Sequence, residues 1–463
     1  MRTTPHVLAA AALALAGCTM IPAYDRPALP VPSEWPAAAA SQPAPPGARP
    51  AAEIGWQEYF ADPGLRKVIE TALANNRDLR VAALAVEKAQ ALYRIQRSEL
   101  TPSFGVQATG ERYKLPKTMG DPKVVQQYTA QVGISAWEID LFGRLRSLSA
   151  AAVEQYMATE EARAAAQISL VGAVAASWLN LAADQEHLAL SRSILEAQQA
   201  SVELIRRSNE LGVASDLDLR QAESQVDTAR AGVAAYTALV AADRSALDVL
   251  AGAPVPAELL PGPWSGLQGL PAVSAGVPSD VLVRRPDILA AEHLLKAANA
   301  SIGAARATFF PRITLTAGGG SMSDDLSKLF GSGSGTWTFA PQLVSPIFAG
   351  GALKANLKAA RVDREIAVAQ YEKAIQTAFA EVANALVLRT TLVEQRGAEQ
   401  SLVEHLGEAN RLSDARYKAG IDSYLQVLVS QRALLAAQHA LVEVRLAEQA
   451  NLVTLYKVLG GGA

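Results

Sequence analysis

The stretch that decides the fold is RSNELGVASDLDL at residues 207–219, because the chain repeats it as ARYKAGIDSYLQV at residues 415–427. Gly212 in the first copy aligns with Gly420 in the second at an offset of 208 residues, and the run after each copy ends in glycine at the same offset. Self-similarity at a fixed period is typical of one structural unit used twice. A period near 200 residues is too long for a solenoid, so it predicts two domain-sized halves that pack side by side.

The repeat extends upstream of these stretches. Arg285-Pro286-Asp287-Ile288 matches Asn76-Arg77-Asp78-Leu79, and Pro311 matches Pro102, each at an offset of 209 residues. We therefore predict a first repeat over residues 63–252 and a second over residues 281–460, each with a helix, a β-hairpin and two long helices. The segment at 253–280 is rich in proline and glycine, and we expect it to be a linker.

Composition narrows the class of protein. Charged residues make up 19% of the 463 residues and the net charge is −3. This balance lacks the basic surface that nucleic acid requires, so we predict no nucleic-acid partner. Half of the residues are hydrophobic and many of these are alanine, which favours long helices packed through small side chains.

Residues 1–17 have the features of an export signal. Arg2 supplies a positive charge, and Val7–Ala16 is an apolar run too short to span a bilayer. The small residues before Cys18 resemble a bacterial lipobox, whose cysteine is lipidated and becomes the first mature residue. The alternative is an ordinary cleaved signal that leaves a spare thiol. Since Cys18 is the one cysteine of the chain, an intrachain disulfide is excluded.

Proline and alanine dominate the segment that follows. No helix or central strand tolerates this density of proline, so we expect residues 18–62 to form an extended, lipidated N-terminal tether. Trp35 and Trp56 are its expected anchor points. Pro63 after Asp62 is typical of a helix start.

The spacing of apolar residues predicts helices in both halves. Residues 63–100 have helical periodicity up to Pro102. Gly143 to Gly212 contains no proline, and as a helix it would be roughly 100 Å long. A second helix at 216–250 returns antiparallel, with Gly212 as the C-cap at the tip. The second half repeats this arrangement with helices at 287–309, 351–420 and up to Leu459.

Between these helices the apolar period changes to two, which is typical of strands with one apolar face. Four such segments occur, at 104–109, 128–136, 313–318 and 337–343, with a glycine/serine loop expected at 319–335. Four strands cannot close a barrel, and an open edge in lipid leaves backbone groups unpaired at several kcal/mol each. If the strands lie in a membrane, several chains must share one barrel. The alternative is a small soluble sheet packed on helices.

Several motifs taken together resemble outer-membrane efflux proteins, the lipoprotein exit ducts of tripartite pumps (the TolC/OprM/NodT type). The motifs are the lipobox, WEIDLFG at 137–143, RRPD at 284–287 with FFP at 309–311, and the two repeated stretches. They cover essentially all of the mature chain in the expected order.

The resemblance implies a mixed fold. A long antiparallel α-helical coiled-coil barrel would cross the periplasm, and a membrane β-barrel of twelve strands would be shared among three chains, both built from the two tandem repeats. The implied protein is a homotrimer in the outer membrane, in contact with its lipid, with a periplasmic adaptor and an inner-membrane RND-type transporter as partners. It conducts drugs or other small toxic compounds passively. Its one covalent group would be diacylglycerol and an N-acyl chain on Cys18, without a cofactor or metal.

The resemblance also places a gate at the two helical tips, which opens like an iris. Leu425 would form an apolar constriction, and Arg416 or Tyr417 would hold Asp218 through a charge-assisted contact. Valine at Val429 and glutamine at Gln426 replace acids that family members use, which counts against an acidic ring. The alternative is solvated turn residues that cap helices. The gate candidates are Asp218, Arg220, Arg416, Tyr417, Asp422 and Leu425, and the tip turns are Gly212 and Gly420.

The residue inventory argues against an enzyme. The five histidines, His6, His187, His293, His405 and His439, are scattered and form no His-x-x-x-His pair. Gly318-Gly319-Gly320 lies between a strand and a loop without a following helix, so it is not a dinucleotide fingerprint. Two other functions remain open, an outer-membrane channel for type I protein secretion and a coiled-coil lipoprotein without a pore.

Overall fold

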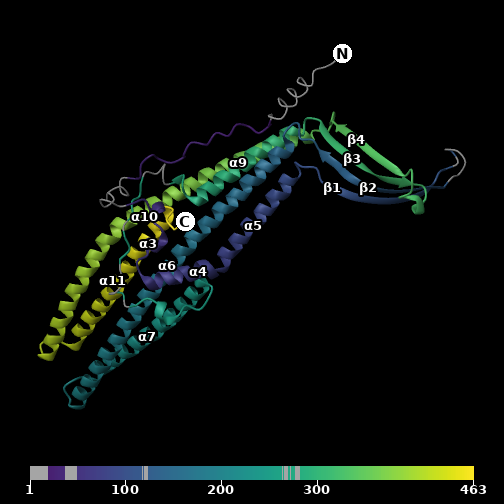
Figure 1. The fold of residues 1–463 in the computed structure, drawn as a ribbon. Helices are drawn as coiled ribbons and strands as arrows, with labels where there is room; N and C mark the ends of the chain where they lie inside the picture. The colour runs from purple at the N-terminus through teal and green to yellow at the C-terminus, as the bar shows by residue number, and fades with distance from the viewer. Residues whose placement is uncertain are drawn as a thin grey trace. The chain divides into compact units, whose positions relative to one another are not determined.

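The computed structural model describes residues 19–36, 49–116, 118, 124–262, 264, 269–271, 273–276 and 282–462. The chain divides into two compact units (Figure 1). One contains residues up to Ala28, Leu84–Glu160 and Leu289–Lys373, and the other contains Leu29–Ala83, Glu161–Ile288 and Ala374–Ala463. The predicted export signal and Cys18 lie outside the described residues.

The order of helices confirms the internal repeat. Helices α5 (Arg77–Ser98) and α9 (Pro286–Ala307) have 22 residues each, and α6 (Arg144–Glu210) and α10 (Ala352–Lys418) have 67 each. The returning helices α7 (Asp216–Ala251) and α11 (Tyr424–Val458) have 36 and 35 residues. By length and composition α6 can cross a membrane, but half of its most apolar window is buried in the protein, as in a packed core helix.

The helix predicted over 63–100 is broken in two at Asn76. Helix α4 (Pro63–Asn75) starts after Asp62, whose side chain accepts a hydrogen bond from the Leu65 amide at 2.9 Å. Asn76 has ψ of 132°, and its amide oxygen accepts from the Leu79 amide at the start of α5. Its Nδ2 donates to the Leu250 carbonyl. The prediction of one continuous helix was wrong because Asn76 is at once the C-cap of α4 and the cap of α5.

Both long hairpins end in the same turn. Gly212 has φ of 69° and Gly420 has φ of 71°, in the left-handed region that favours glycine. The amide of Gly212 bonds to the Asn209 carbonyl and that of Val213 to the Ser208 carbonyl, and the turn at Gly420 repeats this pattern. These are the two bonds of a Schellman C-cap, which explains why the glycine recurs in the sequence repeat.

Aromatic packing closes the core of the second unit. Helix α3 (Trp56–Tyr59) follows a 3-10 turn, η1 (Ala51–Glu53), and places Tyr59 in a stack on Tyr456 with ring centroids 3.9 Å apart. The Tyr456 hydroxyl donates to the Ile54 carbonyl at 2.6 Å. Trp35 stacks on Phe379, which agrees with its predicted role as an anchor of the tether. A further 3-10 turn, η3 (Ala257–Leu259), packs against α4.

Residues 19–28 of the tether lie against α9 in the first unit. Arg26 forms two hydrogen bonds with the buried Glu292, at 3.0 and 2.7 Å. Asn299 donates to the Pro22 carbonyl, and Arg306 donates to the Met20 carbonyl. A Cβ at Gly303 would lie 2.8 Å from the Ile21 backbone nitrogen, so glycine permits this close approach. The segment directly after Cys18 is therefore an ordered strap.

The first unit also carries one four-stranded antiparallel sheet in the order β1-β2-β3-β4. Its strands are β1 (Phe104–Lys114), β2 (Val124–Glu138), β3 (Arg312–Ser323) and β4 (Gly335–Val344). A 3-10 turn, η5 (Leu326–Lys328), lies between β3 and β4.

The loop predicted at 319–335 begins later than expected. Gly319 and Gly320 belong to β3, where Gly320 pairs with Gln131 on one side and Thr336 on the other. A Cβ at Gly320 would lie 2.0 Å from the Ala130 carbonyl oxygen. Close backbone approach, rather than a loop, therefore requires this glycine.

Candidate functional sites: an apolar sheet face and two helical tips

Strand register aligns the large apolar side chains on one face of the sheet. One row across the four strands is Phe104, Ile134, Ala317 and Phe339. Phe104 and Phe339 are 74% and 62% exposed, although residues of this size are usually buried. The neighbouring row runs from Val106 through β2 and β3 to Trp337, and both of these residues are even more exposed. A contiguous exposed face of this kind marks a surface that meets a membrane or another protein.

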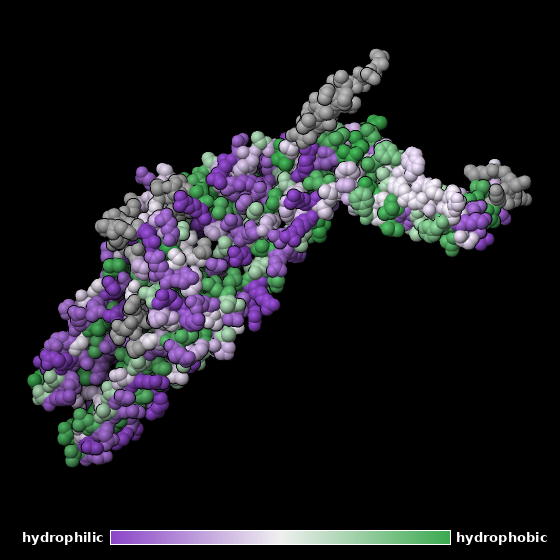
Figure 2. Space-filling model, in the orientation of Figure 1, coloured by the Kyte–Doolittle hydropathy of each residue, from purple (hydrophilic) through white to green (hydrophobic). Residues whose placement is uncertain are grey.

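The opposite face of the sheet is polar. Gln107, Gln131, Gly320 and Thr336 pair across the four strands in register. Figure 2 shows the visible surface of the sheet in green and white, with purple gathered near its outer end. One apolar and one polar face is the pattern of a barrel strand between lipid and a water-filled lumen.

A β-bulge keeps the apolar face continuous near the base of β2. The register shifts between Ile134 and Trp137, and Ala136 adopts φ of 49°. Because of this extra residue, Ile134 and Trp137 pair with Ala317 and Leu315, which are two residues apart on β3. The sequence predicted regular alternation up to Ala136, and this detail was wrong because the bulge lies inside the strand.

Charged side chains fix the base of the sheet. Glu138 accepts two hydrogen bonds from Arg144, at 2.9 and 2.7 Å, and lies 2.6 Å from Nε of Arg312. In this way the last residue of β2 is tied to the first residues of α6 and β3. WEIDLFG and FFP meet here as well, since Phe142 stacks on Phe310 at 4.8 Å. These residues hold the junction between strands and helices.

At the first tip, Ser215 is the N-cap of α7 and Asp218 completes the cap from the third helical position. Its carboxylate accepts hydrogen bonds from the Ser215 amide and hydroxyl, while the Ser215 hydroxyl accepts from the Asp218 amide. This is a capping box. Arg220 is paired with Glu223 at 2.8 Å on the same helix. The described hydrogen bonds and ion pairs of Asp218 and Arg220 thus stay within the first tip.

At the second tip, Arg416 is paired with Asp422. Nε lies 2.6 Å from Oδ2 and Nη2 lies 3.0 Å from Oδ1. The hydrogen bond from Arg416 lowers the pKa of Asp422 below its ordinary value. The contact predicted between Arg416 and Asp218 does not form within the described chain, because each side chain already has a partner in its own turn.

An apolar cluster joins the two tips. Tyr424 is buried between α6 and α7, and its hydroxyl lies 3.2 Å from the Ser201 hydroxyl. Tyr417 packs on this cluster, with its ring 5.3 Å from that of Tyr424. Burial and then the charge of Asp218 raise the pKa of Tyr417. Arg416 and Tyr417 were the predicted partners of Asp218. Of the two, Tyr417 has a pKa that the charge of Asp218 shifts.

Leu425 is left outside this cluster. It is 56% exposed, and Val429 lies one turn further along α11 and is 53% exposed. Residues four apart lie on one helix face, so the two side chains form an exposed apolar pair beside the tip. Gln426 is exposed next to Leu425. Gln426 and Val429 occupy the positions where other family members were expected to have acids, so this chain cannot form an acidic ring there.

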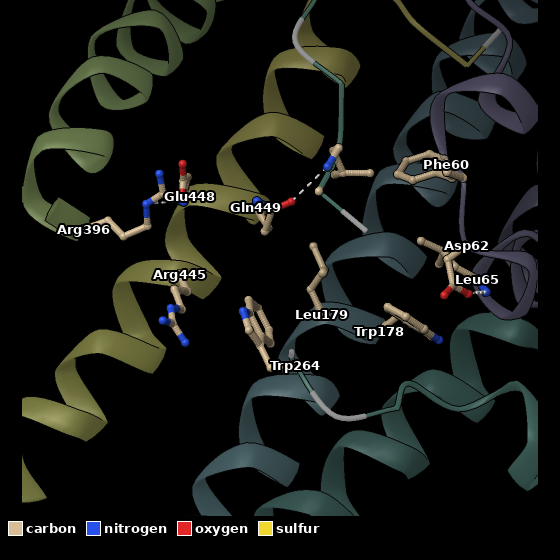
Figure 3. Close-up of a pocket in the computed structure, with 13 residues that line it drawn as sticks. Phe60, Asp62, Leu65, Trp178, Leu179, Trp264, Arg396, Arg445, Glu448 and Gln449 are labelled. Atoms are coloured by element: carbon tan, nitrogen blue, oxygen red, sulfur yellow. Dashed lines mark hydrogen bonds and ion pairs between the residues drawn. The ribbon is translucent and has the colours of Figure 1, made fainter. Parts of the chain in front are cut away.

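The second unit also contains a pocket of about 140 Å³ (Figure 3). Trp178, Leu179 and Trp264 line it, and Gln449 accepts a hydrogen bond from the Leu270 amide at its edge. Arg396 is paired with Glu448 at 3.4 Å. None of the predicted gate residues reaches it. In the part of the chain that the structure describes, no group of three or more His, Cys, Asp or Glu side chains can hold a metal ion.

Sequence reasoning missed two contacts in the second unit. The sequence did not point to Tyr424 and Ser201 as a link between the tips, although Tyr424 stands at the start of a helix in the repeated stretch. It treated His187 and His439 as isolated, yet their Nδ1 atoms lie 2.7 Å apart. No short spacing could have revealed this pair, because 252 residues separate its members.

The comparisons with known proteins agree with this geometry. The model of the outer membrane efflux protein family matches residues 68–253 and 277–461. The chain is 48% identical to the toluene efflux pump outer membrane protein TtgC and to the antibiotic efflux pump outer membrane protein ArpC, both of Pseudomonas putida. Each alignment covers 98% of this chain and 95% of the relative.

Among solved structures, the open state of the Neisseria gonorrhoeae MtrE outer membrane channel is similar with a TM-score of 0.87 and 38% identity. The similarity covers 96% of this chain and 98% of MtrE. A four-stranded sheet with an exposed apolar face and a polar face, in a chain that also has two long helical hairpins, defines the class of outer-membrane transport proteins. The chain belongs to the outer membrane efflux protein family. Its place is the outer membrane, and its role is efflux.

Proposed function

We propose that the protein is the passive outer-membrane exit duct of a tripartite, RND-type efflux system, and that it works as a homotrimer. The observation that carries this proposal is the sheet. Within the described residues, β1 and β4 each pair on one side only, while the face they share exposes Phe104, Val106, Trp337 and Phe339. Unpaired edges cost several kcal/mol per backbone group in lipid. Copies of the chain must therefore complete the barrel edge to edge.

Three copies would give twelve strands, an even number within the range of membrane barrels. The polar face with Gln107, Gln131 and Thr336 would line the lumen. The partners that complete such a system would be a periplasmic adaptor and an inner-membrane transporter that supplies the energy. The duct itself would carry out no catalysis, in line with the efflux family to which the chain belongs.

The closed end of the duct would be the pair of helical tips. Leu425 and Val429 would narrow the lumen as an apolar constriction. Asp218, Arg220, Arg416 and Asp422 would hold each tip in shape, and Tyr417 would link the two tips through the cluster around Tyr424. The turns at Gly212 and Gly420 would allow each hairpin to end sharply at the gate.

Cys18 would carry diacylglycerol and an N-acyl chain. The support is the lipobox together with the strap at residues 19–28, which starts directly after Cys18 and is bound to α9 through Arg26 and Glu292. An anchored strap of this kind would hold the acyl chains close to the membrane sheet.

The cargo would be small organic compounds, as the names of the relatives TtgC and ArpC state for toluene and antibiotics. The test is deletion of the gene followed by a susceptibility panel of solvents, antibiotics and metal ions. We expect at least a fourfold loss of tolerance to solvents or antibiotics, restored by the wild-type gene. Unchanged tolerance together with loss of an exported protein would favour a secretion channel, and no phenotype in either assay would favour a coiled-coil lipoprotein without a pore.

A further inference from the structure

Two histidines from different repeats meet in the middle of the helical hairpins. His187 of α6 is 1% exposed, and its Nδ1 lies 2.7 Å from Nδ1 of His439 on α11. The other ring nitrogen of His187, Nε2, lies 3.0 Å from Oε1 of Glu443. Tyr236 of α7 stacks on both imidazoles, with centroid distances of 4.9 and 5.4 Å. Helices α6, α7 and α11 therefore share one cluster of titratable side chains.

The number of protons that this contact can hold is limited. A hydrogen bond between two Nδ1 atoms needs a proton on one of them and a lone pair on the other. A neutral pair satisfies this condition, and so does a pair with one imidazolium, whose charge Glu443 can balance. When both rings are imidazolium, each Nδ1 carries a proton and two positive charges face each other. The contact cannot survive the second protonation.

The charged neighbours do not remove this limit. The titratable groups that contact the pair are Tyr236 on α7, whose hydroxyl lies 3.4 Å from Nδ1 of His439, and Glu443 on α11, whose charge acts on His439. Burial, followed by the charge of His187, lowers the pKa of His439 below its ordinary 6.5.

There is also space for the contact to open. A cavity of about 400 Å³ lies beside the pair and is lined by Leu190, Tyr236, Gln438 and His439 itself. A protonated His439 ring can turn into this space and be hydrated there, because Gln438 lines it, and the Tyr236 hydroxyl, 3.4 Å from Nδ1 in the closed contact, can then accept its proton in a hydrogen bond. Rearrangement therefore does not require the helices to unfold.

We propose that the His187–His439 contact is an acid-sensitive lock that holds α11 of the second repeat against α6 and α7 of the first, and that it opens when both imidazoles are protonated. The sign follows from linkage: a histidine whose folded pKa is lowered gives its full stabilisation above pH 6.5, and this is lost as the pH falls from 6.5 to the lowered pKa. The lock is a property of helix packing and does not depend on the proposed duct function.

Hydrogen–deuterium exchange of the purified full-length protein in detergent tests the lock. Exchange would be followed in peptides covering residues 183–191 and 435–443 between pH 7.5 and 5.0, with labelling times scaled for the intrinsic pH dependence of exchange. We expect protection in both peptides to fall with pH, by up to about tenfold for each pH unit below the pKa of the second protonation. Unchanged protection of the wild type at pH 5.0 would overturn the proposal.

Two variants and a control make the test specific. His439→Phe keeps a stacked ring without a proton, so protection should stay high down to pH 5.0. Glu443→Gln removes the carboxylate that stabilises the first imidazolium, so the loss of protection should shift to lower pH. His405→Phe, at an exposed site on α10, should keep the wild-type response. A full acid response in His439→Phe would contradict the lock. If that variant does not fold, an unshifted response in Glu443→Gln would do so.

Discussion

Arg416 and Asp422 clasp the turn of the second hairpin from both sides of Gly420, through two hydrogen bonds of 2.6 and 3.0 Å. The first tip is bridged by Asn209 instead, which donates to the Ala214 carbonyl and to Asp216 across Gly212, and is also held by the capping box of Ser215 and Asp218. The two repeats thus use one backbone turn but different side-chain supports. This difference gives each tip its own test.

Arg416→Gln should loosen the second tip without destabilising the protein. Arg416 is 54% exposed and Asp422 is partly exposed, and ion pairs near the surface add little to global stability. We expect faster amide exchange at residues 416–424 and an unchanged thermal midpoint. Arg411→Gln, which removes an exposed pair with Glu408 further up α10, should leave exchange at the tip unaltered. Equal exchange in Arg416→Gln and the wild type would show that the clasp does not order the turn.

Asp218→Asn combined with Tyr417→Phe should raise the single-channel conductance of the protein in planar bilayers. The first change weakens the cap of α7, and the second removes the hydroxyl of Tyr417, whose pKa responds to Asp218. Asp227→Asn is the matched control, because Asp227 is an exposed acid of α7 paired with Arg230 away from the tip. The gate assignment is untenable if the double variant conducts like the control.

Gly320→Ala should block assembly of the sheet. The added Cβ would lie 2.0 Å from the Ala130 carbonyl oxygen, and relieving this overlap costs about 3 kcal/mol by analogy with overpacked cores. Gly105→Ala on β1 is the control, since a Cβ there has no atom within 4 Å. We expect much less folded protein in the outer membrane for Gly320→Ala only. Equal amounts of the two variants would mean that the paired register of β2 and β3 is wrong.

Cys18→Ala should abolish the incorporation of radiolabelled palmitate into the protein. The reason is chemical, because no other cysteine is present in the sequence to accept a thioether-linked lipid. Arg26→Gln, which alters the strap but not the cysteine, should be labelled like the wild type. Labelling that persists in Cys18→Ala would refute the lipid assignment.

Arg26→Gln should also destabilise the strap in a pH-dependent way. Burial alone would raise the pKa of Glu292, but hydrogen bonds from Arg26 and Lys296 outweigh it, so the pKa is lowered. A lowered carboxylate pKa gives stability that is present above pH 4.5 and is lost as the pH falls through the folded value. Arg26 is half exposed, so we expect a loss of only about 1 kcal/mol at pH 7.

Thermal unfolding at pH 7 and pH 3 measures this effect. The difference between Arg26→Gln and the wild type should shrink at the lower pH, where Glu292 takes up a proton. Arg49→Gln removes an ion pair with Glu58 in which both partners are exposed, and it should show no comparable loss. A difference for Arg26→Gln that is independent of pH would exclude the ion pair as its cause.

The sequence was sufficient for the architecture because apolar periodicity is local and the repeat aligns the two halves at a fixed offset. The spacing of Gly212 and Gly420 located both tips, and the change of period from 3.6 to 2 located the four strands. The break at Asn76 was missed because its caps join residues on both sides of a continuous apolar pattern. The extension of β3 through Gly320 was missed because glycine gives the same signal in a loop and in a crowded strand.

The details of the tips were less predictable. Asp218 was expected to bind across to the second tip, but Ser215, three residues before it, is a closer partner. Arg416 is paired with Asp422, only six residues away. The prediction placed its partner, Asp218, in the first repeat instead. Long-range pairs such as Ser201 with Tyr424 depend on how the helices pack, and helix periodicity does not specify that.

The mass of the purified protein in detergent, measured by light scattering with the detergent contribution subtracted, tests most directly whether copies of the chain share one barrel. Our account predicts a single species with the protein mass of three chains, which keeps this mass in mild denaturant. A clean monomer with an intact β-sheet signal would contradict it.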